Sequence, residues 1–163
     1  MTYCCGILVR DGLVMIADTR TNAGLDNISV FRKLHTYTLP GERVMAMVYS
    51  AGNFIECTID TPYLQIGEHK YGKPVLDRAI THDTDLYDAL KIGLISVDST
   101  MRSNLSVGMP LDLLVMRRDT LKPELAYRIE PGEPYFQDLR QRWSAALRAA
   151  HRDIPRPPYV NQG

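Results

Sequence analysis

Residues 3–18 read YCCGILVRDGLVMIAD, two apolar stretches separated by a short polar turn. The first stretch is apolar at both alternating positions, which is typical of a strand that is covered on both faces of a sheet. Asp11-Gly12 is a favoured two-residue hairpin turn, so the second stretch is predicted to return as an antiparallel partner. In that register Cys5 faces Asp18. The hairpin therefore brings Asp18 to the end of the sheet at which the chain begins.

The rest of the chain predicts alternating blocks of strands and helices. Further strands are expected over 30–39, 43–49, 111–117 and 124–129, helices over 73–80, 84–99 and 134–151, and polar loops over 20–27 and 101–108. Thr84 or Asp85 is the expected cap of the second helix. This order indicates an α+β fold with stacked layers rather than a doubly wound parallel sheet. We expect a single domain over 1–153 and a proline-rich tail over 154–163.

The composition excludes several classes of protein. Nineteen basic and nineteen acidic side chains cancel, so neither nucleic acid nor a membrane surface is an expected partner. No apolar run is long enough to span a membrane, and the first residues lack the pattern of a signal peptide. Three cysteines without C-x-x-C spacing and four scattered histidines predict no metal site and no cofactor. The cysteine usage favours a cytoplasmic location.

The start of the chain carries the chemistry. Removal of Met1 would make Thr2 the amino-terminal residue, with a hydroxyl nucleophile beside its own α-amine. The unperturbed pKa of an α-amine is about 7.7–8.0, close to the pH at which a general base works best. Lys33 would stabilise developing negative charge, and Asp18 would hold its ammonium. Each residue alone has an ordinary structural explanation; their joint spacing favours the catalytic one because it falls inside the longer family resemblance described next.

These residues belong to a longer match. Residues 2–7 (TYCCGI) and 13–22 (LVMIADTRTN) resemble the start of proteasome β-type subunits, and residues 21–35, 50–56, 64–74 and 98–108 are similar, more narrowly, to Anbu, the bacterial ancestral β subunit. The resemblance covers nearly the whole chain. It implies a four-layer αββα sandwich of the N-terminal-nucleophile hydrolase type, a homo-oligomeric ring or open ring, and threonine-dependent hydrolysis of peptides or small amides.

The same resemblance implies roles for individual residues. Thr2 is the nucleophile, supported by Asp18 and Lys33, and Ser103, in the loop after the long helix, lies near the amine of Thr2. Thr21 and Asn22 lie on the strand edge that holds an extended peptide substrate. A non-catalytic assembly or scaffold subunit is the rival interpretation, and the sequence leaves any ATPase partner open.

The sequence departs from the family pattern at three places. Lys33 falls one residue short of the usual distance from the nucleophile, and Glu68 stands where relatives often carry a serine; its carboxylate either interacts with the amine or points away. Relatives also have several tens of residues, including two helices, where this chain joins Val48 to Tyr49. Our hypothesis is that these two residues are not neighbours in the natural polypeptide, so part of the helical layer is missing. Gly52 is then not the glycine of the oxyanion hole.

Overall fold

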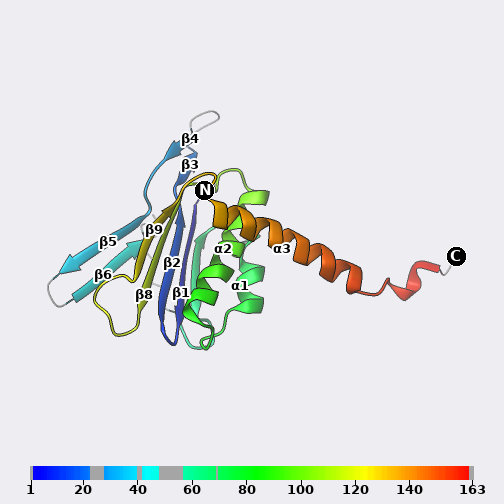
Figure 1. Cartoon of the computed structure of the whole chain (residues 1–163), viewed down its shortest axis with the longest axis horizontal. Coiled ribbons are helices and arrows are strands. Elements are labelled where there is room, and N and C mark those ends of the chain that lie inside the picture. Colours follow the sequence, from blue (N-terminus) through cyan, green and yellow to red (C-terminus); the bar gives the residue numbers. More distant parts are fainter. Residues whose placement is uncertain (1, 23–27, 40–41, 48–56, 69, 162–163) are drawn as a thin grey trace. The chain divides into compact units, whose positions relative to one another are not determined.

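A computed structural model describes residues 2–22, 28–39, 42–47, 57–68 and 70–161 of the 163-residue chain (Figure 1). Its contacts form two compact units, Met1–Pro131 and Gly132–Gly163. The expected division into a domain over 1–153 and a tail over 154–163 stays a prediction.

The first unit is built on a five-stranded antiparallel sheet. Its strands follow the order β7-β1-β2-β8-β9, where the bounds are β1 (Tyr3–Val9), β2 (Gly12–Asp18), β7 (Tyr63–Gly67), β8 (Leu111–Arg117) and β9 (Leu125–Ile129). Two separate strand pairs accompany it: β3 (Arg20–Asn22) with β4 (Ile28–Val30), and β5 (Leu34–Leu39) with β6 (Glu42–Met47). The chain is thus a mixed α+β protein with an antiparallel sheet, as predicted.

The β1–β2 hairpin is confirmed, but its predicted register is wrong. Val9 pairs with Gly12, so Arg10 and Asp11 form the two-residue loop and Gly12 belongs to β2. A Cβ atom on Gly12 would lie 2.1 Å from the Met116 carbonyl oxygen, so a glycine lets β8 approach this closely. The shift by two residues leaves every side chain on its predicted face.

Two predicted boundaries differ in the region that approaches the start of the chain. Arg20–Asn22, expected in a loop, is strand β3, and the strand expected over 30–39 is divided into β4 and β5 by a link over 31–33. Each part pairs with its own partner strand, which the partial alternation of the sequence did not separate.

Helix α2 (Leu86–Ser103) is longer than predicted, so Ser103 is helical rather than in a loop. The Ser99 and Thr100 hydroxyls donate to the carbonyls of Ile95 and Ser96 one turn earlier, which lets this polar stretch continue the helix. Asp85 caps the other end through the N–H groups of Tyr87 and Asp88, as its position suggested.

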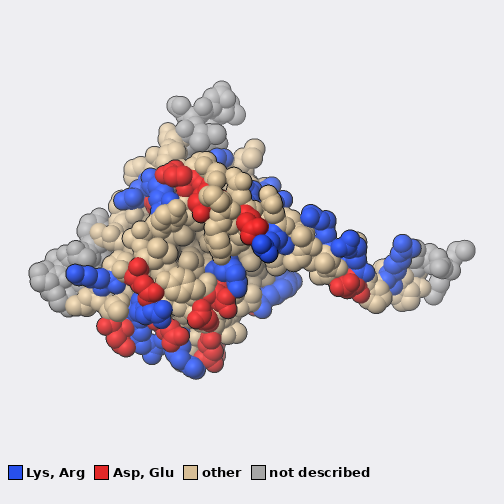
Figure 2. All heavy atoms as spheres, in the orientation of Figure 1, with Lys and Arg blue, Asp and Glu red and all other residues tan. Residues whose placement is uncertain are grey.

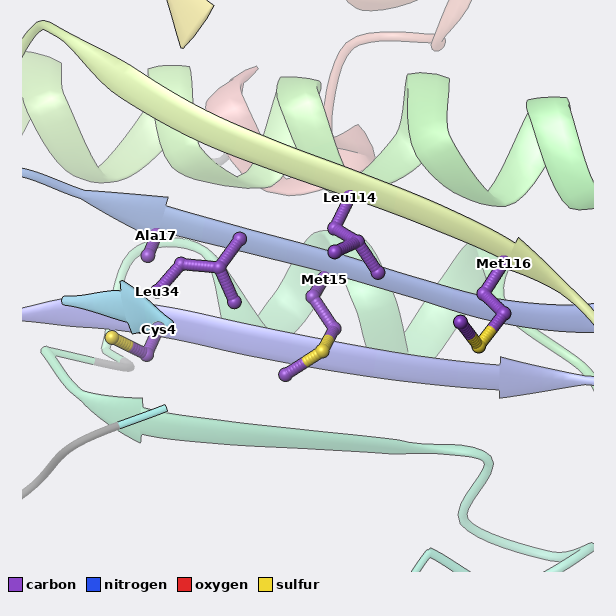
Figure 3. Packing of buried hydrophobic residues seen from close by; sticks show 6 residues of the cluster. All are labelled: Cys4, Met15, Ala17, Leu34, Leu114 and Met116. Carbon is purple, nitrogen blue, oxygen red and sulfur yellow. The ribbon is translucent and has the colours of Figure 1, made fainter. Parts of the chain in front are cut away.

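Helices and strands cover opposite faces of the sheet. Helix α1 (Lys73–Ala79) and α2 lie together on one face, while the β5–β6 pair lies on the other (Figure 1). Tyr3 reaches α2, where its hydroxyl donates to Ser96 over 2.8 Å. On the opposite face Leu34 of β5 packs over Cys4 and Ala17 (Figure 3). The full cluster comprises Cys4, Met15, Ala17, Leu34, Leu114 and Met116.

The second unit consists of α3 (Pro134–Asp153), capped by Glu133, and a short 3-10 turn over Pro158–Asn161. No helix in the described parts of the chain is long and apolar enough to cross a membrane. Figure 2 shows acidic and basic side chains intermingled on the face in view.

Candidate active site

Both ends of the Thr2–Tyr3 peptide bond are held. The Thr2 carbonyl accepts a hydrogen bond from the Glu68 N–H over 2.7 Å. The Tyr3 N–H donates to Asp18 Oδ1 over 2.8 Å in a buried setting. The half-buried Thr2 is therefore oriented by β2 on one side and by the end of β7 on the other. Fixed orientation of a reacting group is a large part of what an active site supplies.

Asp18 is the centre of this arrangement. It is fully buried, and its Oδ1 also accepts from Lys33 Nζ over 2.5 Å while its Oδ2 accepts from the Gly108 N–H over 3.4 Å. Burial raises the pKa of Asp18 above its ordinary value, against the opposing effects of the Lys33 ammonium and the Tyr3 N–H. Because of the two-residue register shift, Asp18 lies beside Tyr3 and closer to Thr2 than the predicted pairing with Cys5 implied.

Lys33 reaches the site despite its short sequence spacing. It lies in the link over 31–33 between β4 and β5, and its side chain is 7% exposed. Besides Asp18, its ammonium donates to the Arg20 carbonyl over 2.8 Å. The Arg20 side chain in turn donates to the Leu105 carbonyl over 2.9 Å, which ties the start of β3 to the segment after α2.

Gly67 makes the close approach of β7 to Thr2 possible. Its φ is +90°, in the region that favours glycine, and a Cβ atom there would lie 2.0 Å from the Thr2 carbonyl oxygen. The hydrogen bond from Glu68 to Thr2 depends on this geometry.

Glu68 is a buried carboxylate beside the nucleophile position. Its residue is 7% exposed, and its Oε2 accepts from Asn104 Nδ2 over 3.0 Å. The Glu68 carbonyl accepts from Gln65 Nε2 over 2.9 Å, while Gln65 Oε1 is buried and has no donor among the described residues. The Asn104 side chain is itself fixed, because its Oδ1 accepts from the Ser106 N–H over 2.9 Å.

The structure gathers Thr2, Asp18 and Lys33 but leaves other predicted residues elsewhere or undefined. Ser103 is exposed at the last position of α2. Thr21 and Asn22 lie in β3, paired with Ser29 and Ile28 of β4, and no further described strand pairs with the other edge of β3. The Val48–Tyr49 join and Gly52 lie outside the described residues.

Sequence reasoning missed three residues that shape the site, namely Gly67, Asn104 and Gly108. For Asn104 a signal was present, because asparagine two residues before a serine is typical of a turn closed by the asparagine side chain. Within the described residues, no group of three or more His, Cys, Asp or Glu side chains is arranged to hold a metal ion.

Comparison with family models and with curated proteins finds no match. Solved structures match over almost the whole chain. An Anbu (Gly-1) mutant from Hyphomicrobium sp. strain MC1 is 34% identical, with a TM-score of 0.89 over 96% of this chain and 99% of that chain. The chain belongs to the Anbu family.

Two further Anbu structures agree with this assignment. Anbu from Yersinia bercovieri, described as an ancestral β-subunit, is 32% identical with a TM-score of 0.84, covering 95% of this chain and 98% of its own. The helical assembly of the Anbu complex from Pseudomonas aeruginosa is 35% identical with a TM-score of 0.87, covering 98% and 99%.

Proposed function

We propose that this Anbu is an N-terminal threonine hydrolase that cleaves peptides or small amides. Removal of Met1 frees the α-amine of Thr2, which takes the proton from the Thr2 hydroxyl as that oxygen attacks the carbonyl carbon of the substrate. The Lys33 ammonium stabilises the negative charge that develops, and Asp18 keeps it in place.

The observation that carries this proposal is the set of contacts at Asp18. One buried carboxylate oxygen accepts both the Tyr3 N–H, at 2.8 Å, and the Lys33 ammonium, at 2.5 Å. Tyr3, which follows Thr2, and the Lys33 ammonium thus bind the same oxygen atom of Asp18. A buried ion pair is weak evidence for stability alone, so its attachment to the backbone of the residue after Thr2 favours a catalytic role.

The substrate would lie along the edge of β3 that faces away from β4, where the backbone of Thr21 and Asn22 would bind it as an added strand. Ser103 remains a predicted contributor near the amine of Thr2. The cysteine usage, three residues without C-x-x-C spacing, supports the proposed cytoplasmic location.

The proposed architecture is the four-layer αββα sandwich, assembled into a homo-oligomeric ring or open ring. The helices on one face of the sheet and the strand pair on the other support this architecture. The helical assembly of the Pseudomonas aeruginosa Anbu complex supports self-association. Light scattering on the purified protein tests it, and a monomer at all concentrations would refute it.

The test of the activity is covalent labelling with a peptide electrophile directed at N-terminal threonine. Wild type and Thr2→Ser should be labelled, because both keep a hydroxyl beside the α-amine, whereas Thr2→Ala should not. Intact mass shows whether Met1 has been removed. Equal labelling of wild type and Thr2→Ala, or retention of Met1, would instead favour the scaffold subunit.

A further inference from the structure

The Glu68 carboxylate is buried, and no cation among the described residues neutralises it. No lysine, arginine or histidine in the described residues forms an ion pair with it, and its one side-chain hydrogen bond comes from the neutral Asn104 amide. A buried charge is costly unless it is paired as well as hydrogen-bonded. Within the described part of the chain, this carboxylate therefore has hydrogen bonding but no paired positive charge.

The neighbouring cations do not supply that charge. The described elements around Thr2 contribute the following charged or titratable groups: Tyr3, Cys4, Cys5, Asp18, Arg20, Arg32, Lys33, Lys70, Tyr71, Asp98 and Arg102. Lys70 is exposed and forms no ion pair with Glu68, and Arg32 is paired with Asp112 over 3.5 Å. Lys33 is paired with Asp18, and Arg102 is paired with Asp98 over 3.2 Å. The Arg20 guanidinium is bonded to the Leu105 carbonyl.

Removal of Met1 creates a new cation at this place. The Glu68 N–H is bonded to the Thr2 carbonyl over 2.7 Å, so the carboxylate and the α-nitrogen belong to adjacent residues of neighbouring segments. An ammonium has three N–H donors. The side chain of Gln65, in β7, donates to the Glu68 carbonyl, while its Oε1 is buried without a donor among the described residues, so an acceptor near Glu68 is unused.

We propose that Glu68 is a positioning residue for the nucleophile: its carboxylate, held by Asn104, pairs with the α-ammonium of processed Thr2. This inference rests on the proposed function, because it needs the amine that removal of Met1 exposes. The pair fixes the rotation of the amine relative to the Thr2 hydroxyl. It also favours the charged form of the amine, so the general base becomes available at a higher pH than it would without Glu68.

The test measures the pKa of the Thr2 α-amine itself. In protein labelled with ¹³C at threonine Cα, the pH dependence of the Thr2 signal, assigned by its loss in Thr2→Ser, gives this pKa without requiring turnover. Glu68→Gln should lower it by about one unit, since an opposite charge within about 4–6 Å shifts a pKa by roughly 1–3 units. The pH profile of electrophile labelling should move to lower pH by the same amount.

Matched variants separate positioning from general damage. Glu124→Gln removes the same charge, but Glu124 is bound to Arg117, which lies opposite Gly12 at the far end of the sheet, so it should leave the amine pKa unchanged. Asn104→Ala, which frees the carboxylate without removing it, should give a smaller shift in the same direction. Glu68→Asp keeps the charge and should retain part of the effect.

The outcomes distinguish this inference from the proposed function. An amine pKa that is the same in wild type, Glu68→Gln and Asn104→Ala would overturn the role of Glu68, even if labelling at Thr2 persists. A shifted amine pKa without any labelling would support the Glu68 pair and refute the hydrolase. Retention of Met1 would overturn both.

Discussion

The buried pair of Asp18 and Lys33 can be tested with a double-mutant cycle. The Asp18 side chain is fully buried and that of Lys33 is 7% exposed, so removing one charge strands the other in the interior. Stranding a buried partner costs about 3–5 kcal/mol in the free energy of unfolding. Asp18→Asn and Lys33→Met should both approach this range.

The two single variants should lose different amounts of stability, and the hydrogen bonds that each one keeps predict which loss is larger. In Asp18→Asn the ammonium loses its counter-charge and keeps only neutral acceptors, among them the Arg20 carbonyl, so this variant should lie near the top of the range. In Lys33→Met the carboxylate keeps the Tyr3 and Gly108 N–H groups, so the loss should lie near the bottom.

The cost of Lys33→Met should also depend on pH. Burial already raises the pKa of Asp18, and loss of the ammonium raises it further above its unfolded value. A group with a raised folded-state pKa favours folding at low pH and opposes it above that pKa. The deficit of Lys33→Met should therefore shrink as the pH falls through the folded-state pKa of Asp18.

The double variant separates the stability effect of the ion pair from its effect on labelling. Asp18→Asn with Lys33→Met leaves no stranded charge, so its free energy of unfolding should return to within about 2 kcal/mol of wild type. Labelling of Thr2 should nevertheless stay lost, because the cation is gone. Urea unfolding followed by circular dichroism measures the first quantity and mass spectrometry the second. Single variants as stable as wild type would refute the cost of a stranded buried charge. A double variant with normal labelling would refute the need for the Lys33 cation.

The packing around β1 leads to two more predictions. Gly67→Ala places a methyl group 2.0 Å from the Thr2 carbonyl oxygen and forces an unfavourable φ at residue 67. The labelling rate should fall by about 10²-fold, as expected when a reacting group is misplaced by about 1 Å. An unchanged rate would contradict the close approach of β7 to Thr2. Burial raises the pKa of both Cys4 and Cys5 to about 12, so neither should react with iodoacetamide at pH 8 until the protein is unfolded. Rapid alkylation of either thiol in the native protein would show that the strand is not covered as described.

Sequence patterns predicted elements well where one residue type decides the local geometry. Apolar runs on both sides of a polar turn identified the hairpin, and Asp85 marked the start of α2. The register failed because Asp11-Gly12 is a strong turn signal, whereas the reason for Gly12 lies in β8, about a hundred residues away. Tertiary contact of that kind has no local signature.

The nucleophilic and charged residues of the candidate site could be predicted from the sequence, whereas the residues that form hydrogen bonds around them were missed. Thr2, Asp18 and Lys33 could be identified from their spacing, and the structure brings them together. The role of Gly108 could not be identified, because it binds Asp18 through its backbone N–H; for Asn104 the sequence indicated the turn, but not the bond to Glu68, which spans 36 residues of sequence. Contacts of this kind depend on packing that the periodicity of the sequence does not encode.

If Thr2 becomes a free N-terminal nucleophile, an electrophile that needs such a residue should form its covalent adduct there, and locating this adduct is the most direct measurement. A peptide epoxyketone can close a ring only with a residue that offers both a hydroxyl and a free α-amine. After reaction and digestion, tandem mass spectrometry should place one adduct on Thr2, on a peptide that no longer carries Met1. An adduct on any other residue, or an unmodified N-terminal peptide that still begins with Met1, would show that Thr2 is not a free N-terminal nucleophile.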